Sequence, residues 1–201
     1  MKSPFRYQTT EYDCVPTTFT NAIQFLFDRE KIPPEIVQKI MQYSLDTVNR
    51  HGETGKRGTT AIAVQMILQW VTESSKPNKF SVTYEYHRGE NVHLRQNNRI
   101  VSCLNRRGVA LMSVCYDDKP SIYHYMLALQ ADEDYIYFFD PLYRKRGFID
   151  KELIWLGKNR EEGQTPNIKV TRQRLDLPYA VKYSFGTIAE RECCLLERIA
   201  P

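Results

Sequence analysis

The sequence lacks any long apolar run. A membrane-spanning helix needs about 18 consecutive apolar residues, and no segment of the chain approaches that length. Residues 1–7 also contain no apolar region of the kind that opens a secretory signal. We therefore expect a soluble, cytoplasmic protein without a membrane span.

Cysteine is too sparse and too irregularly spaced for a disulfide scaffold. The 201 residues include five cysteines, with no Cys-x-x-Cys pair, and an odd count leaves at least one thiol without an intrachain partner. Cys193 and Cys194 are adjacent, and neighbouring side chains in a strand point to opposite faces, so the two are poorly placed to share one tetrahedral metal. We expect neither a metal nor another cofactor, and a single reactive cysteine is the option to pursue.

A concentration of charge of one sign is also missing. The formal charge is +4, and basic residues exceed acidic ones by only 13 to 10 in residues 1–100 and 15 to 14 in residues 101–201. The basic clusters are short and scattered, so we interpret them as solvated surface rather than a phosphate-binding stripe. These clusters are Lys56-Arg57, Arg106-Arg107 and residues 144–146. We therefore expect no nucleic-acid partner.

The first half of the sequence is helical in pattern. Residues 15–27 carry apolar side chains at helical spacing. Pro16 is tolerated in a first turn and Asp13 suits the N-cap position, so this helix would begin at or beside Cys14. A second helix is predicted from residue 33 to a stop at Gly52, with Leu45 and Val48 on its apolar face. A third is predicted after an N-cap at Thr59 or Thr60.

The second half changes to β-structure. Apolar runs predict four strands, over residues 80–86, 109–116, 122–130 and 135–139, and a helix over residues 90–107. Helices followed by an antiparallel sheet define an α+β fold. We expect a single domain over residues 1–201 with its core in about residues 5–150. Residues 151–201 would be an unassigned C-terminal extension of the sheet, with strand-like pieces at 168–170, 180–185 and 193–199.

Three residues with the chemistry of nucleophilic catalysis lie at the ends of elements or interrupt an apolar pattern. Cys14 lies where a helix begins, and the positive end of a helix dipole favours thiolate over thiol. His124 interrupts an apolar strand, and Asp140 follows the next strand. If the two strands pair as a hairpin, the end of the second lies beside the start of the first, which brings Asp140 within reach of His124.

Gln8 stands six residues before Cys14, where a short loop could fold its amide NH₂ back toward the thiol. A cysteine becomes a strong nucleophile once an imidazole takes its proton. The imidazole is then held through its other N–H by a carboxylate. A tetrahedral oxyanion needs donors already aimed at it, and a Gln amide with the backbone N–H at a helix start can supply two.

Each of these residues alone has a simpler interpretation. A cysteine at a helix start is more often a small core residue, and a histidine in an apolar strand is more often a satisfied core residue. Asp-Pro after a strand is usually a turn. The order and spacing of the four residues together favour a functional site.

The set resembles a known family. Gln8-x5-Cys14 at the head of a helix, His124 in an apolar strand and an Asp-Pro step at Asp140 resemble the papain-like peptidases that remove double-glycine leader peptides from bacteriocins. The resemblance covers roughly residues 5–150 and implies a papain-like α+β fold, with N-terminal helices packed on an antiparallel sheet. It implies that Cys14 is the nucleophile, His124 the general base and acid, Asp140 the orienting carboxylate and Gln8 the oxyanion donor. Double-glycine specificity is not carried over.

We expect a cysteine peptidase that cleaves a peptide or protein substrate through an acyl-enzyme. Two alternatives stay open. A papain-like acyltransferase or amidase would use the same residues and hand the acyl group to an amine instead of water. A catalytically silent module would bind peptides without cleaving them, although it would have no need of all four site residues.

Overall fold

The structure, a computed structural model, describes residues 1–44, 49, 51–75, 79–119, 122–157 and 163–199. Its α-helices are α1 (Cys14–Leu26), α2 (Pro34–Tyr43), α3 (Ala61–Glu73), α4 (Arg99–Asn105) and α5 (Arg172–Leu175). Its strands are β1 (Val82–Arg88), β2 (Val109–Cys115), β3 (Tyr123–Ala131), β4 (Tyr135–Phe139), β5 (Leu153–Trp155), β6 (Ile168–Thr171) and β7 (Glu192–Arg198).

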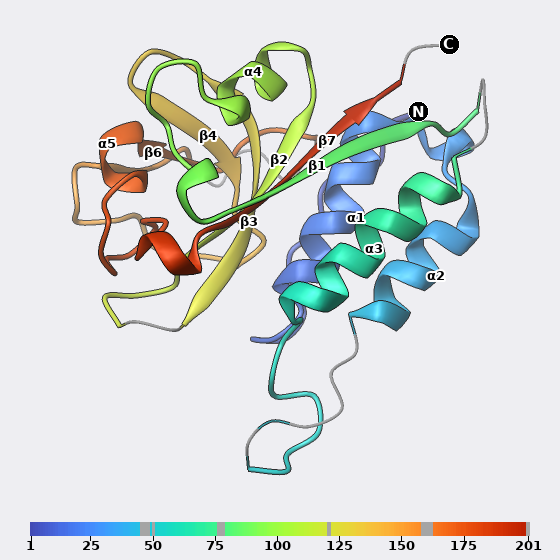
Figure 1. Ribbon diagram of the computed structural model, residues 1–201, viewed down its shortest axis with the longest axis horizontal. Helices are drawn as coiled ribbons and strands as arrows, with labels where there is room; N and C mark the ends of the chain where they lie inside the picture. Colours follow the sequence, from blue (N-terminus) through green and yellow to red (C-terminus); the bar gives the residue numbers. More distant parts are fainter. Residues whose placement is uncertain (45–48, 50, 76–78, 120–121, 158–162, 200–201) are drawn as a thin grey trace.

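Within the described residues the strands form one seven-stranded sheet in the order β1-β7-β2-β3-β4-β6-β5. Every pairing is antiparallel. Helices α1, α2 and α3 lie together on one side of the sheet, whereas α4 and α5 lie on the other (Figure 1). The predicted α+β arrangement of N-terminal helices and an antiparallel sheet is therefore confirmed.

Both faces of the sheet are buried. Leu111 and Leu127 pack into the core under α1–α3, and their neighbours Met112 and Met126 pack into the core under α4 and α5. Burial on both faces explains why β2 is a continuous apolar run instead of an alternating one. Cys194 and Cys193 also enter opposite cores, as predicted.

Helices α1, α2 and α3 begin where the sequence predicts, but α2 is shorter than expected. The Thr60 side chain accepts a hydrogen bond from the Ala63 N–H and caps α3. Helix α2 ends at Tyr43 and does not continue to Gly52. Leu45 and Val48, which were assigned to its apolar face, lie outside the described residues.

The helix predicted over residues 90–107 was wrong in extent. The segment forms a 3₁₀ turn at Gly89–Asn91, and α4 then spans only Arg99–Asn105. Asn97 has a left-handed backbone (φ 57°), which breaks a helix at that point. Asn98 then starts a new one, because its side chain accepts from the Val101 N–H.

The hairpin on which the site depends is present. Strands β3 and β4 pair with Leu127 opposite Phe139. Asp132 closes the turn by accepting from the N–H groups of Asp134 and Tyr135. This register places the residues after β4 beside the first residues of β3.

Residues beyond 150 are built into the sheet. Strand β7 lies between β1 and β2 and pairs with both, and β6 pairs with β4. The predicted strand at 180–185 is wrong: Tyr183 has a positive φ of 63°, which ends an extended run. No helix in the described part of the chain is long and apolar enough to cross a membrane. The cytoplasmic location stays a prediction.

Candidate functional site

Cys14 is the first residue of α1 and is partly exposed, whereas the other cysteines, Cys103, Cys115, Cys193 and Cys194, are buried. Helix α1 is anchored to β3 next to this point, because the Thr18 hydroxyl donates to the Tyr125 carbonyl across 3.1 Å.

Asp13 occupies the N-cap position of α1, but its side chain does not cap the helix. Its carboxylate instead accepts from the N–H groups of Thr9 and Thr10, at 2.9 and 2.8 Å. The predicted capping role was therefore wrong. The carboxylate is used to fold the loop that precedes the helix, and that loop carries Gln8.

His124 is the second residue of β3 and is only 3% exposed. Its Nε2 lies 2.7 Å from Oδ1 of Asp140. The imidazole also interacts with the Cys14 side chain, and because Nε2 is engaged by Asp140, Nδ1 is the ring nitrogen left for the sulfur. The structure thus brings three of the predicted residues together in the order thiol, imidazole, carboxylate.

The contacts within the buried pair of His124 and Asp140 favour its charged form. Burial by itself would lower the pKa of His124, but the charge and hydrogen bond of Asp140, together with Cys14, raise that pKa to about 9. Burial would likewise raise the pKa of Asp140, but the charge and hydrogen bond of His124, with Arg144 and Tyr183, hold it well below its usual value. An imidazolium beside a carboxylate is therefore the favoured state near neutral pH.

Asp140 has further partners that the sequence did not indicate. Its Oδ1 also accepts from the Leu142 N–H at 2.9 Å. Its Oδ2 accepts from the Tyr183 hydroxyl at 2.5 Å and from Nε and Nη2 of Arg144 at 3.3 Å. We had interpreted residues 144–146 as solvated surface, and for Arg144 this was wrong. Its side chain is 18% exposed because it lies against Asp140.

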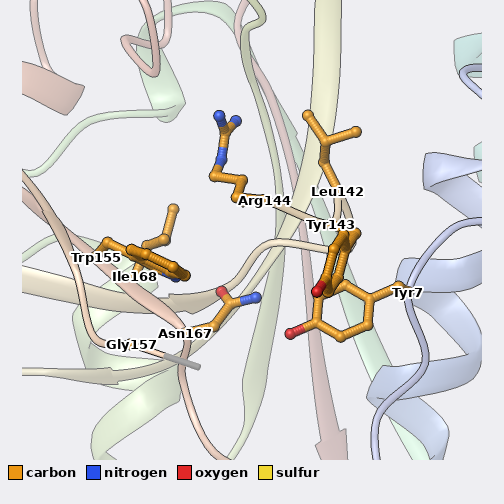
Figure 2. Close-up of a pocket in the computed structure, with 8 residues that line it drawn as sticks. All are labelled: Tyr7, Leu142, Tyr143, Arg144, Trp155, Gly157, Asn167 and Ile168. Carbon is orange, nitrogen blue, oxygen red and sulfur yellow. The ribbon is translucent and has the colours of Figure 1, made fainter. Parts of the chain in front are cut away.

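Asn167 holds the backbone of the same residue. Its Oδ1 accepts from the Asp140 N–H at 2.7 Å, and its Nδ2 donates to the Asp140 carbonyl at 2.8 Å. Asn167 and Arg144 line a small pocket of about 20 Å³ beside the site. Figure 2 shows the guanidinium of Arg144 pointing away from the rings of Tyr7 and Tyr143 on the opposite wall.

Gln8 lies at the mouth of the site. Its backbone N–H donates to the carbonyl of Pro141 at 2.8 Å, which joins the N-terminal loop to the residue after Asp140. Its Nε2 donates to the Thr10 carbonyl at 2.8 Å. The amide is therefore fixed, with one of its two N–H groups used by Thr10. Its Oε1 is buried and has no hydrogen-bond partner among the described residues.

These side chains open into one groove of about 1020 Å³. Gln8, Cys14, His124 and Leu142 line it, and a Tyr116 ring stands edge-on to the imidazole at 6.1 Å. The remaining lining residues come from the segments before α1, between α2 and α3, and between β2 and β3, and from the first residue of β3: Glu11, Tyr12, Asn49, His51, Lys56, Arg57, Asp117, Ile122 and Tyr123.

The arrangement combines the groups that thiol chemistry uses. A partly exposed sulfur beside a charged, buried imidazole has the features of an activated nucleophile. Among the described residues, no group of three or more His, Cys, Asp or Glu side chains is placed to hold a metal ion.

No protein-family model matches the chain, and no curated protein matches it. The resemblance to the bacteriocin-processing peptidases therefore stays a prediction that rests on Gln8, Cys14, His124 and Asp140.

Proposed function

We propose that the protein is a cysteine peptidase of papain-like architecture, in which Cys14 is the nucleophile, His124 the general base and acid, and Asp140 the orienting carboxylate. The observation that carries the proposal is the buried His124 imidazole, held by Asp140 at 2.7 Å on one side and interacting with Cys14 on the other. A histidine that only filled the core would need neither a buried carboxylate nor a thiol that opens into a groove.

The reaction follows from these positions. The Cys14 thiolate attacks the carbonyl carbon of a peptide bond, and the oxyanion is stabilised by the free amide N–H of Gln8 and a backbone N–H at the start of α1. The His124 imidazolium gives its proton to the departing amine, which leaves a thioester on Cys14. Water then attacks the thioester while His124 takes its proton, and the acid and the thiol are released.

A peptide is the substrate that suits the groove. The space of about 1020 Å³ is lined by both polar and aromatic side chains and is large enough to take a stretch of peptide. The order of Gln8, Cys14, His124 and Asp140 resembles that of leader-processing peptidases, which supports a peptide bond as the point of attack. We leave the residues on either side of the cleaved bond unassigned.

Alkylation by iodoacetamide, followed by intact mass, tests the nucleophile. We expect the wild-type protein to gain one adduct rapidly, and Cys14→Ala to gain none on that time scale. Cys103→Ala is the matched control, because burial raises the pKa of the Cys103 thiol to about 12 and makes it unreactive. Unchanged labelling of Cys14→Ala would refute Cys14 as the reactive thiol.

Turnover is tested separately with a proteome-derived peptide library, in which new N-termini are identified by mass spectrometry. Cys14→Ala should produce none. Addition of a primary amine distinguishes the outcomes, since a hydrolase releases free acids and an acyltransferase releases amides. Amide products in place of acids would show that the protein is an acyltransferase and not a peptidase.

A further inference from the structure

The two oxygens of the Asp140 carboxylate have different partners. Oδ1 faces His124 Nε2 and the Leu142 N–H, whereas Oδ2 faces the Tyr183 hydroxyl and the Arg144 guanidinium. One buried negative charge is therefore shared by two cations, the imidazolium and the guanidinium. Only the imidazolium side opens toward Cys14.

The backbone of Tyr183 is strained in this position. The residue is completely buried and has a φ of 63°, a left-handed conformation that is unfavourable for a non-glycine residue. The surrounding chain enforces it, because Tyr183 N–H donates to the Cys115 carbonyl and Cys115 N–H donates to the Ser184 carbonyl, both at 2.8 Å. The result is a hydroxyl aimed at Oδ2 of Asp140.

Arg144 completes the support. Its guanidinium lies over the Phe148 ring at 4.8 Å and over the Tyr183 ring at 5.4 Å, and these two rings contact each other edge to face at 5.8 Å. Its Nη2 donates to the Tyr183 oxygen, and the Tyr183 hydroxyl donates its own hydrogen to Asp140. A hydroxyl has one hydrogen to give, so this chain runs from Arg144 through Tyr183 to the carboxylate.

We propose that Arg144 is a positioning residue that competes with His124 for the charge of Asp140 and thereby sets how firmly His124 keeps its proton. This inference rests on the proposed function, in which the protonated imidazole must hand that proton to the leaving amine. Arg144 is not among the residues that line the groove, and its hydrogen bonds reach the site through Asp140 and Tyr183.

The direction of the effect follows from the sign of the charges. The positive charge on Arg144 cancels part of the negative potential that favours the imidazolium. Loss of that charge should therefore raise the pKa of His124 further above the present value of about 9. The guanidinium lies on the far side of the carboxylate from the imidazole, and a unit charge at a separation on the order of 10 Å is worth roughly one pH unit at an effective dielectric constant near 20.

Other charged and titratable groups face the pair of His124 and Asp140, and the variants that test Arg144 must leave them unchanged. The Lys182 ammonium donates to the Tyr116 carbonyl at 2.9 Å and also interacts with Asp140. The titratable and charged groups that face His124 and Asp140 come from both ends of the chain. From the N-terminal half they are Glu11 and Tyr12 before α1, Cys14 on α1, and His51, Lys56 and Arg57 between α2 and α3. From the sheet and the segments around it they are Tyr116 and Asp117 after β2, Tyr123 on β3, and Lys182 and Tyr183 before β7.

The test compares Arg144→Gln, which removes the charge, with Arg144→Lys, which keeps it. Turnover falls at high pH as His124 loses its proton, so the alkaline limb of kcat/KM reports its pKa. We expect Arg144→Gln to move this limb upward by about one pH unit, and Arg144→Lys to leave it in place. Lys182→Gln, the matched loss of a nearby charge that does not bond Asp140, should move it less.

A merely structural role predicts the opposite sign. If Arg144 only braced the loop, its loss would loosen the Asp140–His124 contact, and the limb would move downward or stay in place while turnover fell. Either result with Arg144→Gln overturns the proposal. Should that variant not fold, Phe148→Leu removes the ring beneath the guanidinium without touching Asp140, and it should give a smaller upward shift. No shift or a downward one with Phe148→Leu would then overturn the proposal.

An NMR titration of the His124 imidazole carbon separates this inference from the proposed function. It needs no substrate, and its midpoint should rise in Arg144→Gln by the same amount as the limb. A raised midpoint in a protein that cleaves no peptide would keep the role of Arg144 and remove the peptidase. An unshifted midpoint in a protein that does cleave peptides would keep the peptidase and refute the role of Arg144.

Discussion

The two sides of the Asp140 carboxylate differ in what surrounds them. On the reacting side, α1 and β3 present Cys14 and His124 to an open groove. On the supporting side, Arg144, Asn167 and Tyr183 come from three segments that follow β4, and each is buried or mostly buried.

This difference separates reaction chemistry from structural support. The groups that would change protonation or form bonds lie where a substrate can reach them, and the groups that fix the carboxylate lie where water is scarce and hydrogen bonds hold their geometry. Substitutions on the reacting side should therefore lower the rate while the fold survives. Substitutions on the supporting side should lower stability first and the rate less.

His124→Ala should produce the largest effect and defines the reacting side. We expect turnover to fall by on the order of 10⁴-fold, because nucleophile and base act as a unit. Asp140 would keep Arg144, Tyr183 and the Leu142 N–H as partners, so the protein should still fold. The measurements are kcat/KM on an identified peptide and thermal unfolding by circular dichroism. Near-normal turnover would show that His124 is a core residue and not a base.

The reacting side could be predicted because its signals are local. The start of α1, the Thr60 cap and the β3–β4 hairpin each follow from residues close together in the sequence. Once that hairpin is predicted, the proximity of His124 and Asp140 follows directly. The failures are also local: next to Cys14, Asp13 turns its carboxylate to the preceding loop, and on the other face of the sheet Asn97 with Asn98 breaks the helix expected over residues 90–107.

The supporting side could not be predicted in the same way. Asn167 and Tyr183 meet Asp140 across 27 and 43 residues of sequence, and one chain carries no pattern that reports such contacts. Arg144 was within reach, since it stands four residues after Asp140. Because it stands in a basic run with Lys145 and Arg146, the sequence predicts a solvent-exposed side chain for it. Burial of one member of a basic cluster depends on a tyrosine that folds in from far along the chain.

Gln8→Ala should have the next largest effect on turnover. It separates two functions of the reacting side, the reactivity of the Cys14 thiol and the stabilisation of the oxyanion. Loss of one oxyanion donor typically costs 10²- to 10³-fold in kcat, so we expect about a 10²-fold fall in peptide turnover. Alkylation of Cys14 by iodoacetamide forms no oxyanion and should proceed at the wild-type rate.

Gln164→Ala is the matched control for Gln8, because the Gln164 amide also donates to backbone carbonyls, those of Ser3 and Gln24, but is not among the residues that line the groove. It should change neither rate. If Gln8→Ala slowed alkylation as much as turnover, the amide would act on the thiol or on the loop and not on an oxyanion.

Asn167→Ala should have the smallest effect on rate and tests the supporting side directly. The variant leaves the buried N–H and carbonyl of Asp140 without their partners, which should lower the free energy of unfolding by about 2 kcal/mol. Turnover should fall by less than about tenfold, because Arg144, Tyr183 and the Leu142 N–H still hold the carboxylate. Asn98→Ala, the loss of a helix cap remote from the groove, should cost about 1 kcal/mol with no change in rate. If Asn167→Ala lost activity as completely as His124→Ala while the protein stayed folded, Asn167 would belong to the reacting side, and the separation between the two sides of Asp140 would fail.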